Sequence, residues 1–123
     1  TGTGTTMKPG KLVRDKIPTI IRSEGRIPMI RQLSGPELLS ALQDKLAEEL
    51  AEYQAASGDV SRCEELADLI EVIFALARLH GYTEETLMAI AARKKEARGG
   101  FEQGFFYLGD EEAVSSEGQH QDL

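Results

Sequence analysis

The 123-residue sequence has one cysteine, no tryptophan and no long apolar run. Because Cys63 stands alone, no disulfide can form within the chain, which fits the reducing cytoplasm. No apolar stretch approaches the roughly 20 residues of a membrane-spanning helix, and no signal peptide is recognised ahead of the domain. We therefore expect a cytoplasmic protein without a membrane partner.

Positive charge is also scarce, with 14 Lys and Arg against 21 Asp and Glu and a formal net charge of −7. Five of the acids follow residue 108, where no Lys or Arg occurs, so the rest of the chain, with 16 acids and 14 bases, is nearly neutral. A nucleic-acid polymer held by bulk positive charge is therefore not expected as a partner.

The length suits one domain with a single core. The Thr/Gly-rich residues 1–7 are interpreted as an expression remnant or a disordered start, residues 8–108 as the folded domain, and the acidic residues 109–123 as a disordered tail. Proline and glycine interrupt the basic stretch before residue 34, which predicts an irregular N-terminal arm. Within this arm, Pro18 can open a short helix that ends near Gly25, and a strand is predicted near 27–32.

Three longer helices are predicted over residues 34–56, 61–80 and 83–98, so the fold class is all-α. Ser34 and Glu37 have the spacing of a capping box at the first of these helices. The first two should pack antiparallel because their connection is short. The second is apolar around more than half of its circumference, which one neighbour cannot cover, and this favours self-association.

Two acidic pairs, Glu49-x-x-Glu52 and Glu65-x-x-Asp68, lie on the first two of these helices. Residues three apart on a helix project on one face, so each pair places two carboxylates together. Glu49 and Glu65 project among apolar side chains, and no comparable set of Lys or Arg is expected on these faces. An ionised carboxylate removed from water costs several kcal/mol unless it is paired or bound to metal. A single Glu usually only keeps a helix soluble, but the two pairs together predict a site for Mg²⁺, with Mn²⁺ as a substitute.

Three sequence segments, taken with these pairs, resemble a known superfamily: Lys11-Leu-Val-Arg-Asp-Lys-Ile-Pro18, Glu64-Glu-Leu-Ala-Asp68 and Arg98-Gly-Gly-Phe-Glu102. The pattern is similar to the all-α nucleoside triphosphate pyrophosphohydrolases, which include MazG, dimeric dUTPases and phosphoribosyl-ATP pyrophosphohydrolase. It resembles most the small stand-alone members called phosphoribosyl-ATP pyrophosphohydrolase-like. The resemblance covers roughly residues 11–108.

The resemblance implies a MazG-like antiparallel helical bundle, with three main helices per chain completed by oligomerisation as a homodimer or a tetramer. It also implies that Glu49, Glu52, Glu65 and Asp68 hold Mg²⁺ and are the catalytic acids. The substrate would be a nucleoside triphosphate, cleaved to a monophosphate and pyrophosphate in a house-cleaning role. The acid that serves as general base, the number of metal ions and the preferred base and sugar stay open.

A triphosphate also needs positive side chains, and Arg is suited to bidentate phosphate contacts. The candidates are Lys11, Arg14 and Lys16 in the arm and Arg98 at the end of the third long helix. Two alternatives remain. One is phosphoribosyl-ATP hydrolysis in histidine biosynthesis, which the arm and the Arg98-Gly-Gly-Phe101 segment disfavour. The other is a non-enzymatic helical interaction module.

Overall fold

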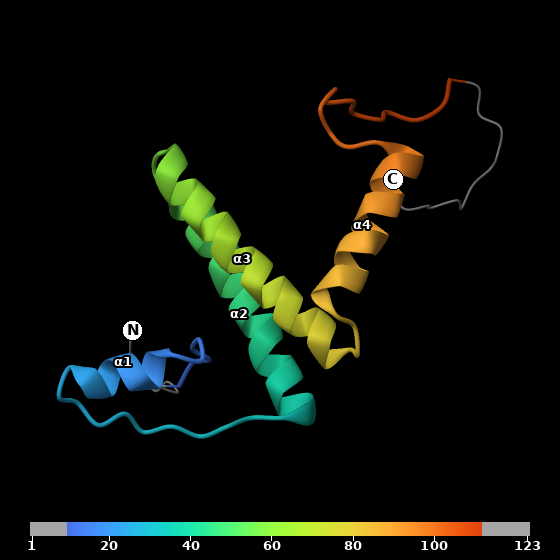
Figure 1. Cartoon of the computed structure of the whole chain (residues 1–123). Coiled ribbons are helices and arrows are strands. Elements are labelled where there is room, and N and C mark those ends of the chain that lie inside the picture. Colours follow the sequence, from blue (N-terminus) through green and yellow to red (C-terminus); the bar gives the residue numbers. More distant parts are fainter. Residues whose placement is uncertain (1–9, 112–123) are drawn as a thin grey trace. The chain divides into compact units, whose positions relative to one another are not determined.

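The computed structural model describes residues 10–111, which contain four helices and no strand (Figure 1). The all-α prediction is confirmed for this part of the chain. Residues 1–7 and positions 112–123 of the predicted tail lie outside the described residues. The chain falls into two compact units that divide between Glu84 and Glu85. The predicted domain limits at residues 8 and 108 stay a prediction.

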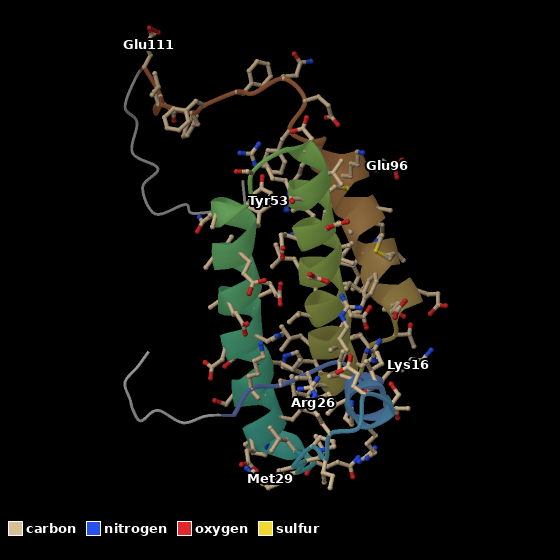
Figure 2. The ribbon with its side chains drawn as sticks, turned by 90° about the vertical axis from the view of Figure 1, so that its left-hand side faces the viewer. Lys16, Arg26, Met29, Tyr53, Glu96 and Glu111 are labelled. Carbon is tan, nitrogen blue, oxygen red and sulfur yellow. The ribbon has the colours of Figure 1, made fainter. Side chains whose placement is uncertain are left out.

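The N-terminal arm carries one short helix, α1 (Ile17–Ser23), which begins where Pro18 predicted it. Residues 26–34 have no regular structure, so the predicted strand near 27–32 is wrong. An isolated strand is not stable without a partner to complete its hydrogen bonds, and Pro28 has no N–H to donate. Ile27 and Met29 are almost fully exposed (Figure 2 labels Met29).

Helices α2 (Gly35–Ala55) and α3 (Asp59–Leu79) lie side by side and form the centre of the first unit (Figure 1). Only residues 56–58 connect them, and this short connection makes them antiparallel, as predicted. Gly58 has φ 88°, a left-handed backbone that glycine adopts without a steric penalty, and it is the residue before α3. The helix therefore starts two residues earlier than the predicted start at Ser61.

Ser34 occupies the position before α2, but its side chain makes no capping hydrogen bond. The predicted capping box is therefore wrong. Glu37 instead accepts two hydrogen bonds from Arg31, at 2.6 and 3.2 Å, and this ion pair draws its carboxylate away from the helix start. A charged partner binds a carboxylate more strongly than a single backbone N–H does.

The core within the described residues is small. The buried residues there are Leu42 on α2, Val72 on α3 and the acidic Glu49. Leu66, Ile70 and Ile73 follow one another at helical spacing along α3, and all three are exposed. Two packed helices can cover only one face of each other, so this outer face of α3 has no neighbouring helix among the described residues of the first unit.

The second unit contains nearly all of α4 (Glu84–Arg98), which begins directly after Thr83 and ends before Gly99, as predicted. Residues 101–108 follow it without a helix, and their aromatic side chains are exposed. No helix within residues 10–111 is both long enough and apolar enough to cross a membrane.

Candidate metal centre

Glu49 is the buried carboxylate of the first unit, with 6% of the residue exposed. Its place on α2 follows from helical periodicity, because it falls within the leucine-rich stripe that packs against α3. Glu65 and Asp68 are half-buried on α3, whereas Glu52 is exposed at the edge of α2. The predicted acids therefore lie on the facing sides and the rim of the α2–α3 pair.

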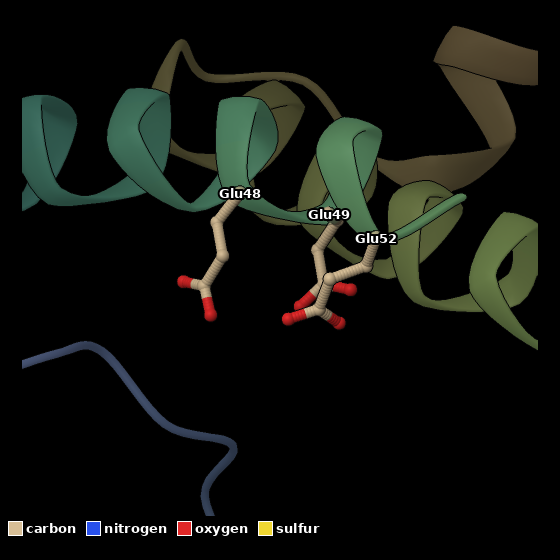
Figure 3. A group of neighbouring side chains, drawn as sticks. All are labelled: Glu48, Glu49 and Glu52. Carbon is tan, nitrogen blue, oxygen red and sulfur yellow. The ribbon is translucent and has the colours of Figure 1, made fainter. Parts of the chain in front are cut away.

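Two groups of three carboxylates form there, and Glu49 belongs to both. Glu48, Glu49 and Glu52 place one oxygen each within 4.8 Å of one another, as do Glu49, Glu65 and Asp68. Figure 3 shows the first group projecting from one side of α2, with the Glu49 and Glu52 carboxylates adjacent. The structure thus brings all four predicted ligands together and adds Glu48.

Two of these carboxylate oxygens have no partner. The Oε1 atoms of Glu49 and Glu65 are buried and accept no hydrogen bond from any residue between 10 and 111. A buried acceptor without a donor is unfavourable, and most such atoms in folded proteins are satisfied. The two oxygens therefore mark a place where a bound positive group would stabilise the protein.

No set of Lys or Arg comparable to the acids was expected on these helix faces, and two cationic side chains contact the cluster, one from α2 and one from the arm. Lys45 lies on α2 with its Nζ atom 3.5 Å from Oε1 of Glu48 and 3.5 Å from Oε2 of Glu49. Arg14 reaches in from the arm and donates from Nη2 to Oδ1 of Asp68 at 2.6 Å. Five carboxylates therefore face two cationic side chains, and the cluster keeps an excess of negative charge.

That excess of negative charge acts on Glu65. The pKa of its carboxyl is raised above the ordinary value of 4.5, first because burial disfavours the charged form and then because Glu52, Asp68 and Glu49 repel it. The unpartnered Oε1 atom agrees with the burial. In the absence of a cation, Glu65 therefore takes up a proton at a higher pH than an ordinary glutamate does.

We expect the metal-free protein to gain stability as the pH falls through the raised pKa of Glu65 towards 4.5. The folded state binds a proton on Glu65 at a higher pH than the unfolded state, whose pKa is near 4.5. The contribution of this proton to the free energy of unfolding is absent above the raised pKa. It grows as the pH falls through that pKa and is complete below 4.5. Glu65→Gln removes the titrating carboxyl and with it this contribution, so the melting temperature of the variant should depend less on pH.

The measurement is thermal unfolding in a chelator at several pH values. Glu64→Gln is the matched control, because Glu64 is the exposed neighbour of Glu65 on the same helix. Its melting temperature should change with pH as steeply as that of the unmodified protein. If the melting temperature of Glu65→Gln changed with pH just as steeply, Glu65 would not be the source of the pH dependence.

The predicted phosphate-binding residues are distributed unevenly. Arg14 contacts the carboxylate cluster through Asp68. Lys11 and Lys16 are exposed on the arm and form no ion pair within residues 10–111 (Figure 2 labels Lys16). Arg98 is the last residue of α4 and belongs to the second unit. A phosphate-binding role for these four residues stays a prediction.

Glu48 and Lys45 are part of the cluster but were not predicted to be there from the sequence. Lys45 precedes Glu49 by four positions, and this spacing puts side chains on the same helical face, so the ion pair was open to prediction. Glu48 projects toward the more polar side of the helix by helical geometry, so its approach to Glu49 and Glu52 was not predicted. It is half-buried and shares the face of Glu49 and Glu52.

The chemistry of the cluster fits a hard divalent cation. Its donors are all carboxylate oxygens, which Mg²⁺ and Mn²⁺ prefer, and no His or Cys takes part in either group. The buried Oε1 atoms of Glu49 and Glu65 supply acceptors that lack a partner. Glu49, Glu65 and Asp68 are the residues that would hold the ion, with Glu52 and Glu48 beside them.

Comparison with known proteins adds little to this geometry. A stretch of 46 residues is 56% identical to a protein of Mycolicibacterium smegmatis that is described as uncharacterized. The match covers 37% of this chain and 47% of that protein, so the chain spans about half the length of this relative. No protein family and no solved structure matches the chain.

Proposed function

We propose that this chain is a Mg²⁺-dependent nucleoside triphosphate pyrophosphohydrolase that releases pyrophosphate and a nucleoside monophosphate. The observation that supports it best is the buried, unpartnered Oε1 of Glu49 among carboxylates from two packed helices. Acids gathered in this way are costly without a cation, and a triphosphate brings further negative charge that a cation can bridge. The resemblance to the MazG-like superfamily points to the same reaction.

Different residues of the chain would bind the ion and the substrate. Glu49, Glu65 and Asp68, with Glu52 at the rim, hold the ion in place. Lys11, Arg14, Lys16 and Arg98 are the proposed phosphate contacts. The bound Mg²⁺ would supply an activated water and neutralise charge on the phosphates. Lys45 would hold the Glu49 carboxylate in place by pairing with Oε2, which leaves Oε1 available for the ion.

The proposal includes a MazG-like bundle completed by a second copy of the chain. The exposed apolar face of α3, formed by Leu66, Ile70 and Ile73, supports it, because a contiguous apolar face on one helix is typically covered. A homodimer is the simplest closed assembly, and a tetramer of two such dimers is compatible with the same face.

We expect Ile70→Asp to convert the proposed oligomer to monomer, because it places a charge at the centre of the apolar face. Val60→Asp is the matched control, since Val60 is an exposed apolar residue of α3 on the side of Glu64 and Glu71. Light scattering coupled to gel filtration measures both variants. A monomeric unmodified protein, or an Ile70→Asp variant of unchanged mass, would contradict the proposal.

Pyrophosphate release tests the activity directly. The purified protein is incubated with Mg²⁺ and a panel of standard and modified nucleoside triphosphates, with phosphoribosyl-ATP included, and pyrophosphate and phosphate are measured separately. Pyrophosphate from nucleoside triphosphates, abolished by a chelator, is the expected result. Cleavage of phosphoribosyl-ATP alone would favour the histidine-pathway enzyme. No release from any compound would favour the helical interaction module.

A further inference from the structure

Arg14 joins the N-terminal arm to the carboxylate cluster. It lies 54 positions before Asp68 in the sequence, and its Nη2 atom is 2.6 Å from Oδ1 of that aspartate. This is the length of a strong charge-assisted hydrogen bond. The arm is therefore attached to α3 at one of the candidate metal ligands.

The guanidinium of Arg14 binds one oxygen of a carboxylate that a metal ion would also contact. Asp68 forms one of the carboxylate groups with Glu49 and Glu65, whose oxygens lie within 4.8 Å of one another. A divalent cation bound to this carboxylate would be close to the positive charge of Arg14, and like charges at such a distance repel. The ion and the guanidinium therefore compete for Asp68.

Arg14 leaves part of the cluster unsatisfied. The Glu49 side chain is 8% exposed, and its Oε1 atom has no hydrogen-bond partner even though Arg14 is in place. A divalent ion can contact several carboxylates at once, whereas the guanidinium donates here to Asp68. The ion thus has an advantage over Arg14 in this cluster.

The ion pair is also weak enough to exchange. The side chains of Arg14 and Asp68 are 56% and 40% exposed, and exposed pairs contribute little to stability because water and salt screen them. Displacement of Arg14 by a divalent ion therefore does not require unfolding of the α2–α3 pair.

We propose that Arg14 is a replaceable cation of the metal site: it neutralises Asp68 in the metal-free protein, and metal binding releases it to contact the triphosphate. This rests on the proposed function. It adds an order of events, because the arm becomes available for phosphate only after the ion is bound. Coupling of this kind is reciprocal, so a phosphate group that holds Arg14 also favours the metal.

The test is Mn²⁺ binding to the full chain without nucleotide, followed by electron paramagnetic resonance of the free ion. Arg14→Gln should bind Mn²⁺ about fivefold more tightly, since an exposed competing ion pair is removed. Arg22→Gln is the matched control, because it makes the same change in the same arm and Arg22 is exposed on α1 with no ion pair within the described residues. Its affinity should change less than twofold, as expected for a distant, screened charge.

A second measurement follows the arginine itself. Addition of Mg²⁺ to the unmodified protein should shift the Nε–H resonance of Arg14 in a nitrogen–proton correlation spectrum, where Arg14→Gln assigns the signal. Equal affinity of Arg14→Gln and the unmodified protein, or weaker binding by Arg14→Gln, would overturn the exchange and leave the proposed function standing. Absence of Mn²⁺ binding in every variant would overturn both.

Discussion

Replacement of Glu49 by Gln is expected to lower pyrophosphohydrolysis by about 100-fold or more, which exceeds the usual effect of residues that only support a metal ligand. Glu49 belongs to both carboxylate groups, so its change removes a donor charge from each. The folded protein should tolerate the change. Gln keeps the size of the side chain, and loss of one negative charge relieves repulsion among Glu49, Glu65 and Asp68 in the metal-free state.

Pyrophosphate release at saturating Mg²⁺ and thermal unfolding in a chelator measure the two effects separately. Glu64→Gln is the matched control, because it removes the same charge from an exposed position on α3. It should retain activity and stability. If Glu49→Gln retained near-normal turnover, the carboxylate cluster would not be the site of the reaction, and the interaction module would account better for the chain.

Divalent metal should raise the melting temperature of the unmodified protein substantially. A ligand that binds only the folded state stabilises it by about 2.7 kcal/mol at 100 times its dissociation constant. For a domain of this size each kcal/mol raises the melting temperature by about 4–8 °C, so a shift of roughly 10–20 °C is expected. The physical cause is the cancellation of negative charge at Glu49, Glu65 and Asp68.

The controls separate specific binding from screening. Potassium chloride at equal ionic strength should give a much smaller shift, because a monovalent salt screens the cluster without coordinating it. Glu49→Gln should lose most of the Mg²⁺ and Mn²⁺ response. A response equal to that of potassium chloride would argue against a coordinated ion.

Helical periodicity was sufficient to predict the framework of the site. It predicted α2 and α3, and the short connection between them predicted their antiparallel packing. It also placed Glu49 on the packed side, because a leucine-rich stripe at helical spacing defines which face is buried. The same rule, applied at four-residue spacing, would have found Lys45 beside Glu49.

Features that depend on contacts distant in sequence could not be predicted in this way. Arg14 and Asp68 are 54 positions apart, and no periodicity relates an arm residue to a helix face. Local predictions also failed where a side chain has a different hydrogen-bond partner from the expected one, or where a segment has none. Arg31 binds Glu37, so the capping box at Ser34 does not form, and the stretch near Pro28 has no neighbouring strand with which to pair.

The short connection between α2 and α3 has a consequence for how the protein folds. Glu49 and Asp68 are 19 positions apart, so closing this hairpin orders only a short loop, and such local contacts form early in folding. Closing the hairpin brings the negative charges of the cluster together. Their mutual repulsion therefore opposes the closure of the same hairpin that creates the site.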